Sequence, residues 1–165
     1  MIGFSSEFLP ILGVAGLGAL VVAGVGGFLT EIGPWYRALR NPSWKPPDWS
    51  FGPVWTIILG CAAFSAAYGW EAAPEGMARI LILLAFIGNG LFNVLWNILF
   101  FTFRRPDWAL AEVPFLWLSV LIALLAVQPY SYSGALLMVP YLVWVAIAAL
   151  LNLRVVELNR PFLGR

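Results

Sequence analysis

Long uncharged apolar runs alternate with short polar segments along this chain. Three runs, Phe8 to Thr30, Phe51 to Trp70 and Ile80 to Phe103, are each long enough to cross the roughly 30 Å hydrocarbon core of a bilayer as a helix. A fourth run, Val113 to Leu153, has 41 uncharged residues and is interrupted at its middle by QPYS at 128–131, a composition typical of a turn. We therefore predict that this run forms two helices joined by a tight turn.

The pattern predicts an all-α integral membrane protein built as a five-transmembrane-helix bundle. The expected helices lie near residues 8–29, 51–70, 80–103, 108–128 and 132–154, in a single membrane domain that covers residues 1–165. Composition agrees with this class, because 62% hydrophobic residues, 10% charged residues and a mean hydropathy of +0.89 leave too little polar surface to coat a soluble globule of this size.

Basic residues are distributed unevenly between the two sides of such a bundle. With five spans, the N-terminus, the loop at 71–79 and the turn near 130 share one side, which carries a single basic residue, Arg79. The other side carries eight: Arg37, Arg40, Lys45, Arg104, Arg105, Arg154, Arg160 and Arg165. The positive-inside rule therefore predicts that the N-terminus lies outside and the C-terminus lies in the cytoplasm.

The first loop of the cytoplasmic side, residues 30–50, is unusually aromatic. Its segment PWYRALRNPSWKPPDW at 34–49 contains three tryptophans, a tyrosine and four prolines. Proline fixes φ and removes a backbone donor, so we expect neither regular helix nor strand there, and we expect the rings to be held in a preset arrangement. Such a segment suits a lid over a flat apolar ligand.

The third predicted helix contains a polar stripe. Asn89, Asn93 and Asn97 recur every four residues and so share one helical face, and Trp96 borders it. Amide groups in a membrane need partners, so this face should point into the bundle or into a cavity. The stripe by itself favours interhelical hydrogen bonding, with Asn152 as a possible partner, and the neighbouring tryptophan and glycines favour a ligand cavity.

Several chemistries lack their usual residues. The chain has one cysteine, Cys61, and no histidine, so no intrachain disulfide, no usual metal site and no histidine-dependent hydrolase arrangement is expected. Glu112 lies near Arg104 and Arg105 at the start of the fourth helix, where a structural role is expected rather than catalysis. We expect no covalently bound cofactor, no metal and no nucleic-acid partner, so a bound haem or porphyrin would be held by shape and stacking.

The first helix carries small residues at regular spacing. Ala15, Ala19, Ala23 and Gly27 fall every fourth residue, which places them on one face and allows another helix to approach closely. We interpret this face as a packing or homodimer surface.

Six segments together resemble the tryptophan-rich sensory protein and translocator protein family, also known as the peripheral benzodiazepine receptors. They are GGFLT at 26–30, WYRALRNPSWKPPDW at 35–49, GPVWTIIL at 52–59, LFNVLWNILFF at 91–101, WALAE at 108–112 and PYLVWVAIAALLN at 140–152. The order WY, NPSWKPP and GPVW is long and specific. The resemblance extends over all but the termini and the second loop on the outer side.

This resemblance implies a five-helix bundle, often dimeric, that binds tetrapyrroles, sterols and other hydrophobic aromatic molecules beneath the first cytoplasmic loop. Carried over by position, the implied ligand-binding residues are Tyr36, Trp44, Pro46, Trp55, Asn93, Trp96, Trp108, Trp144, Ala148 and Leu151. Trp144, Ala148 and Leu151 follow i, i+4, i+7 spacing, so one face of the last helix would offer an aromatic wall beside a small gap.

One departure from the animal members bears on the ligand. Their fifth helix ends in a proposed cholesterol motif with a tyrosine and an arginine, and Leu153 and Glu157 occupy those places here. We therefore expect a bacterial-type, porphyrin-responsive member in a bacterial membrane. The leading hypothesis is a receptor or regulator for protoporphyrin IX or haem intermediates. The alternatives are light-dependent porphyrin breakdown with Trp55 and Trp144 as redox-active residues, and transport of tetrapyrroles or sterols.

Overall fold

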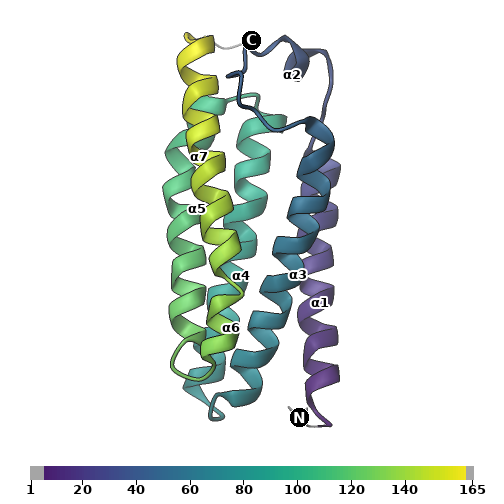
Figure 1. Cartoon of the computed structure of the whole chain (residues 1–165), viewed down its shortest axis with the longest axis vertical. Helices are drawn as coiled ribbons and strands as arrows, with labels where there is room; N and C mark the ends of the chain where they lie inside the picture. The colour runs from purple at the N-terminus through teal and green to yellow at the C-terminus, as the bar shows by residue number, and fades with distance from the viewer. Residues whose placement is uncertain (1–5, 163–165) are drawn as a thin grey trace.

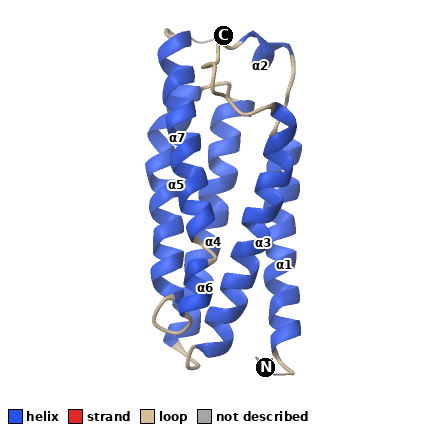
Figure 2. Cartoon of the chain, in the orientation of Figure 1, coloured by secondary structure: helices blue, strands red, loops and turns tan. Residues whose placement is uncertain are grey.

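The computed structural model describes residues 6–162, and within that range the chain is a bundle of helices without strands. Figures 1 and 2 show long helices running nearly parallel to one axis. In chain order the elements are α1 (Phe8–Leu29), α2 (Pro34–Ala38), α3 (Asp48–Ala72), α4 (Met77–Asn97), the π-helix η1 (Ile98–Thr102), α5 (Pro106–Val127), α6 (Tyr132–Leu136) and α7 (Val139–Asn159).

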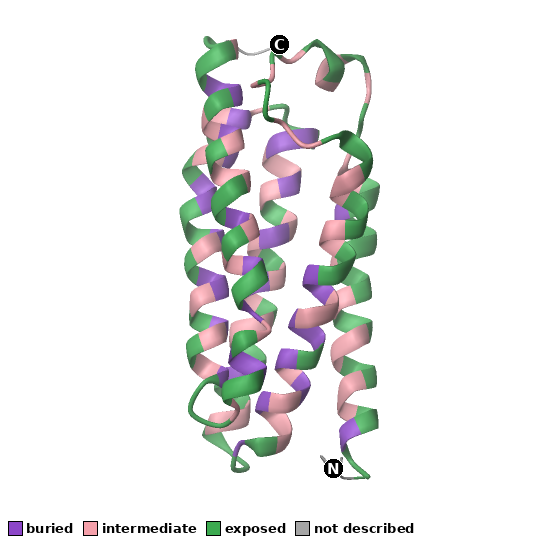
Figure 3. Cartoon of the chain, viewed as in Figure 1, coloured by how far each residue is buried: buried purple, intermediate pink, exposed green. Residues whose placement is uncertain are grey.

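Five helical segments of the described chain are long and apolar enough to span a membrane, which confirms the predicted fold class. They are Phe8–Leu29, Asp48–Ala72, Met77–Thr102, Pro106–Val127 and Tyr132–Asn159. Since apolar side chains can face lipid, many of them are exposed on the outside of the bundle (Figure 3). The chain is an integral, multi-pass membrane protein.

The predicted absence of helix from the aromatic loop is wrong at both ends of PWYRALRNPSWKPPDW. Pro34 occupies the first helical position of α2, where a missing N–H costs nothing, and five residues wind into a short helix. At the other end α3 begins at Asp48, three residues before the predicted start, because an acidic side chain in the first turn is favoured by the helix dipole. Between these helices, residues 39–47 form the irregular part of the loop, which we call the lid loop.

The third span ends in a π-helix rather than in regular α-helix. The Phe103 amide donates to the Ile98 carbonyl, five residues earlier, at 2.9 Å. The consecutive residues Phe100 and Phe101 are both buried in this segment. After it, Arg104 takes a positive φ of 54° and turns the chain into α5.

The predicted turn at 128–131 is confirmed, and the fifth span is divided. The Ser131 hydroxyl caps α6 by accepting a hydrogen bond from the Gly134 amide at 3.1 Å. A break at Leu137 and Met138 separates α6 from α7, whose first turn contains Pro140. Proline lacks the N–H that a continuous helix would need at this point, so the helix restarts there.

The bundle core lies between α3, α4, α5 and α7, whereas α1 packs mainly on α3 at the edge. The largest core cluster includes Ile58, Val120, Met138, Tyr141 and Val145. The small residues predicted on α1 remain half-buried or exposed, and the homodimer stays a prediction.

Candidate ligand-binding site

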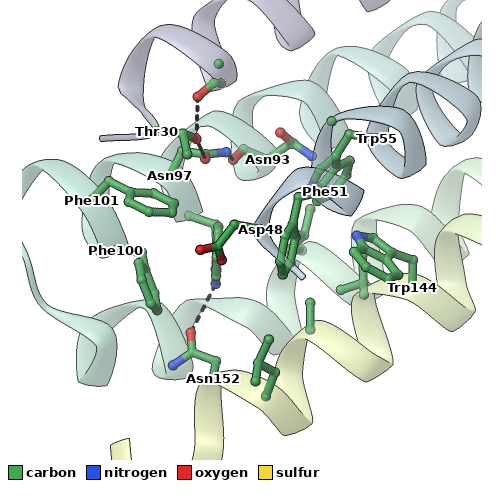
Figure 4. Close-up of a pocket in the computed structure, with 18 of the residues that line it drawn as sticks. Thr30, Asp48, Phe51, Trp55, Asn93, Asn97, Phe100, Phe101, Trp144 and Asn152 are labelled. Carbon is green, nitrogen blue, oxygen red and sulfur yellow. Dashed lines mark hydrogen bonds between the residues drawn. The ribbon is translucent and has the colours of Figure 1, made fainter. Parts of the chain in front are cut away.

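A cavity of about 470 Å³ opens into the bundle at the end that carries α2 and the lid loop. Its walls come from α1, α2, the lid loop, α3, α4, η1, α5 and α7 (Figure 4). The lining is mostly apolar and aromatic, with a few polar groups. Both the volume and this mixture are typical of small-molecule sites.

Three aromatic rings from α3 and α7 form one wall of the cavity. The ring centroids of Trp55 and Trp144 lie 6.5 Å apart with an interplanar angle of 90°, and Phe51 meets Trp144 edge-on at 5.8 Å. Behind them, Tyr141 contacts Trp55 at 5.7 Å between centroids. Edge-to-face contacts of this kind hold aromatic side chains in defined orientations. Within the described part of the chain, the buried indole Nε1 of Trp144 has no hydrogen-bond partner.

A second aromatic wall is built around η1. Trp96 stacks on Phe100 with centroids 5.0 Å apart, and Phe100 and Phe101 lie 4.9 Å apart. From the loop side, Tyr36 contacts Phe101 at 5.8 Å and Trp35 contacts Phe100 at 6.1 Å. The π-helix therefore fastens α2 over one side of the cavity.

The asparagine stripe of α4 forms the predicted interhelical hydrogen bonds, and part of it also lies on the cavity wall. Asn89 donates to the Ser119 hydroxyl at 3.0 Å and Asn93 donates to the Tyr141 hydroxyl at 2.8 Å, so both link helices. Asn93 and Asn97 also line the cavity, where Asn97 accepts from the Thr30 hydroxyl at 3.3 Å.

Asn152 of α7 also places an amide on the cavity wall. Its side-chain oxygen accepts a hydrogen bond from the Trp96 indole at 3.3 Å (Figure 4). Its Nδ2 donates to the Pro106 carbonyl at 2.8 Å. The anticipated link between the α4 stripe and Asn152 thus runs through Trp96 rather than through another asparagine. It holds the Trp96 ring in place against Phe100.

Three polar residues meet at the rim of the cavity. The Lys45 ammonium donates to the Asp48 carboxylate, and the Tyr36 hydroxyl donates to the same oxygen at 3.0 Å. The Lys45 Nζ also lies 4.8 Å from the centre of the Tyr36 ring. Burial raises the pKa of the Tyr36 hydroxyl. Burial alone would lower the pKa of Lys45, but its hydrogen bonds to Asp48 and Tyr36 outweigh this and raise the pKa above its usual value, so the ammonium stays charged.

Most of the residues implied by the family resemblance lie together in this cavity. The lining contains Tyr36, Trp55, Asn93, Trp96, Trp144, Ala148 and Leu151. The other three do not line it. Trp44 is 49% exposed on the lid loop, which turns at Pro42 and Lys45, and Pro46 lies in the same loop. Trp108 is 48% exposed and packs against Phe103 and the Arg105 guanidinium instead.

Several lining residues were missed by reasoning from the sequence. They are chiefly Thr30, Lys45, Asp48, Phe51, Asn97, Phe100, Phe101 and Asn152. The sequence did indicate that Asn97 and Asn152 are buried polar residues. Asn97 belongs to the four-residue repeat of asparagines, and Asn152 was considered as a hydrogen-bond partner of that stripe. Phe100 and Phe101 had no signal, because they reach the cavity through a π-helix that hydropathy does not reveal.

Glu112 does not pair with either of the arginines that lie near it in the sequence. Its side chain is buried in α5, and neither carboxylate oxygen has a hydrogen-bond partner among residues 6–162. Arg105 forms an ion pair with Asp107, and a guanidinium nitrogen of Arg104 lies 3.7 Å from a carboxylate oxygen of Glu31. Neither arginine therefore forms an ion pair with Glu112. Glu112 does not line the cavity, and we assign it no catalytic role.

Comparison with known proteins identifies the family. Residues 14–158 match the TspO/MBR family. The chain is 33% identical over 150 residues to the tryptophan-rich protein TspO of Chlorobaculum tepidum, covering 87% of this chain and 92% of that protein. It is 33% identical over 141 residues to protein CrtK of Rhodobacter capsulatus (86% and 88% covered). It is 32% identical over 145 residues to the translocator protein of Sus scrofa (82% and 85% covered). These relationships support a role as a membrane receptor or regulator, and the chain belongs to the TspO/MBR family.

Proposed function

We propose that this protein is a membrane receptor that binds porphyrins, such as protoporphyrin IX or haem intermediates, and thereby limits their accumulation. The observation that carries the proposal is a cavity with aromatic walls on two sides. Trp55 and Trp144 form one wall, and Trp96, Phe100 and Phe101 form the other. A flat, rigid macrocycle matches such a space because it offers two large apolar faces and loses little conformational entropy on binding.

Apolar contact would supply most of the affinity. Removing about 300 Å² of apolar surface from water contributes roughly 7.5 kcal/mol at 25 cal/mol per Å², before the costs of association. Aromatic stacking on the tryptophans adds to this. The small side chain of Ala148 leaves space beside Trp144 for the edge of a ring system.

The rim supplies a charged group for the polar edge of the ligand. Porphyrins of this class carry two propionate groups, and the Lys45 ammonium lies at the cavity rim. The Lys45 ammonium already donates a hydrogen bond to the Asp48 carboxylate, so a carboxylate of the ligand would compete with Asp48 for Lys45. The ammonium favours ligands that combine an apolar ring with an acidic group, and the competition with Asp48 reduces this gain.

The orientation of the site follows from charge. Seven described basic residues belong to α2, the loops or the end of α7 on the lid side of the bundle (Figure 1): Arg37, Arg40, Lys45, Arg104, Arg105, Arg154 and Arg160. Arg79 lies at the opposite end, where it bonds to the Ala73 carbonyl and Glu75. By the positive-inside rule, the cavity would open toward the cytoplasm.

A dark titration tests this proposal. Purified protein in detergent is titrated with protoporphyrin IX while tryptophan fluorescence is followed. Saturable quenching at a 1:1 ratio is the expected result, because several tryptophans line the cavity. A linear, unsaturable response that free tryptophan also gives would contradict the proposal.

A second candidate function is light-dependent porphyrin breakdown. One specific observation favours it: Trp144, Trp55 and Tyr141 form a continuous series of edge-to-face contacts, and indoles and phenols can donate electrons to a photoexcited macrocycle. Illumination of the bound porphyrin, followed by absorbance, tests this activity. The double variant Trp55→Phe, Trp144→Phe should slow the loss of absorbance, and equal rates in the two proteins would exclude the activity.

A further inference from the structure

A pair of hydrogen bonds joins the lid loop to the last residue of α7. The Arg40 backbone amide donates to the side-chain Oδ1 of Asn159 at 2.9 Å, and Asn159 Nδ2 donates back to the Arg40 carbonyl at 2.8 Å. The two residues are 119 positions apart in the sequence. Figure 1 shows the loop between α2 and α3 at the same end of the bundle as the end of α7.

The Asn159 side chain is held in position before it meets the loop. Its Nδ2 also donates to the Val155 carbonyl, one turn earlier in α7, at 2.7 Å. This local bond fixes the orientation of the amide plane, so less side-chain entropy is lost when Arg40 is bound. Only a planar amide of this length presents one acceptor and two donors in the required directions.

Other hydrogen bonds of the lid loop are local. Within the described residues, Lys45 donates through its amide to Pro42, and Asn41 Nδ2 donates to the Leu39 carbonyl at 2.9 Å. The rim contacts of Lys45 reach Asp48, which is three residues away, and Tyr36, which belongs to the neighbouring helix α2. Bonds over such short separations shape the loop but do not tie it to the far side of the bundle. The Asn159–Arg40 pair ties the loop to α7. The neighbouring residue Leu39 packs on the buried cluster around Phe100.

We propose that Asn159 is a positioning residue that holds the lid loop closed and thereby slows the exchange of ligand through the cavity mouth. Arg40 precedes Asn41, and both Asn41 and Lys45 of the same loop line the cavity. Asn159 itself does not line it, so its effect passes through the loop backbone. The identity of the ligand in this inference rests on the proposed function. The control of access to the cavity by Asn159 does not.

Three variants separate the clamp from general effects. Asn159→Ala removes both bonds to Arg40. Asn159→Asp keeps the acceptor but places an oxygen against the Arg40 and Val155 carbonyls, so it should behave like Asn159→Ala. Glu157→Gln is the matched control, because Glu157 lies two residues away, is exposed and pairs with Arg154 rather than with the loop.

Two readouts need no porphyrin. Hydrogen–deuterium exchange of residues 39–47 reports opening of the lid loop. Labelling of Ala148→Cys in a Cys61→Ser background by a water-soluble maleimide reports access to the cavity, since Ala148 lines it and Cys61 is the sole native cysteine. A third readout is the dissociation rate of protoporphyrin IX in the dark.

We expect faster exchange of the lid loop in Asn159→Ala and Asn159→Asp, with labelling and porphyrin dissociation each accelerated about tenfold. Tenfold corresponds to ~1.4 kcal/mol, the net value of one or two hydrogen bonds. Glu157→Gln should match the wild type in all three readouts.

The outcomes are distinguishable. Unchanged loop exchange in Asn159→Ala would overturn the clamp. Faster loop exchange with unchanged labelling would overturn the gating role. If the wild type binds no porphyrin but Asn159→Ala is labelled faster, the gating role is supported and the porphyrin proposal falls.

Discussion

The indole rings of Trp55 and Trp144 stand perpendicular to each other, with centroids 6.5 Å apart, although they belong to different helices, α3 and α7. This contact closes one side of the cavity, and it depends on the position of both helices. The ring of Trp144 also contacts Phe51, so a change at Trp144 disturbs the whole wall.

Removal of Trp144 should weaken porphyrin binding. Trp144→Ala deletes a stacking surface, and we expect a dissociation constant about tenfold higher, equivalent to ~1.4 kcal/mol. The Soret absorbance in a dark titration measures this without relying on the deleted fluorophore. Trp49→Ala is the control, because Trp49 is 76% exposed and does not line the cavity. Equal losses in both variants would argue against a specific wall at Trp144.

Lys45 should distinguish acidic ligands from their esters. Lys45→Met removes the ammonium at the rim, so we expect about fivefold weaker binding of protoporphyrin IX, within the range for a partly exposed charge pair. Binding of its dimethyl ester should not change, because the ester carries no charge. Asp48→Asn frees Lys45 from its partner and should strengthen binding of the acid. A similar loss for acid and ester in Lys45→Met would contradict the carboxylate contact.

The same residue predicts a flat pH profile above neutrality. Burial alone would lower the pKa of Lys45, but its bonds to Asp48 and Tyr36 outweigh this and raise the pKa above its usual value, so the ammonium stays protonated at mildly alkaline pH. Protoporphyrin affinity measured between pH 7 and pH 9 should therefore not fall through loss of this charge. A decrease over that range that disappears in Lys45→Met would show that Lys45 deprotonates earlier.

Gly69 should be required for close packing between α3 and the end of α5. A Cβ at Gly69 would lie 2.8 Å from Val127 Cγ2, a distance too short for real contacts. We expect Gly69→Ala to destabilise the fold by about 1–3 kcal/mol in a detergent unfolding titration. Val127→Ala should restore part of this loss. Gly60→Ala, on the same helix with no neighbouring atom within 4 Å, should be neutral. Equal effects of Gly69→Ala and Gly60→Ala would contradict the packing argument.

The hydrogen bond between Asn93 and Tyr141 should appear as a coupling energy. Asn93→Ala and Tyr141→Phe each remove one partner of the 2.8 Å bond, and the double variant should cost less than the sum of the two by about 0.6 kcal/mol, the usual value inside a membrane protein. A double-mutant cycle in the same unfolding titration measures this. Leu91→Ala, which changes a 67% exposed residue on α4, provides the control. Strict additivity would show that the bond contributes nothing.

Four of the five spans agree with the sequence prediction to within three residues at each end, whereas the fifth runs to Asn159, five residues beyond its predicted end. The structure differs from the prediction mainly in the segments that connect or end the spans. Hydropathy placed the start of α1 at Phe8 and the turn near Ser131 correctly. It could not reveal η1, because a π-helix has the same apolar composition as the α-helix it extends. It also missed the division between α6 and α7, where one proline outweighs a continuous apolar run.

The site was predicted less completely than the spans, for a related reason. Residues on the faces of regular helices, such as Trp55, Asn93 and Trp144, lie at the cavity as expected. Trp44 and Trp108 are also tryptophans of the family motifs, yet they do not line the cavity. Trp44 lies in a turn of the lid loop, and Trp108 packs against the Arg105 guanidinium.

The sequence by itself determined that this chain crosses a membrane with five helices, because the preference of a 20-residue apolar run for lipid is a local property of that run. Its motifs also carried the family resemblance. Only the tertiary structure decided which polar groups meet, such as Asn93 with Tyr141 and Asn159 with the Arg40 backbone. Those pairings depend on how distant segments pack, and no local pattern specifies the partner of a side chain that lies on another helix.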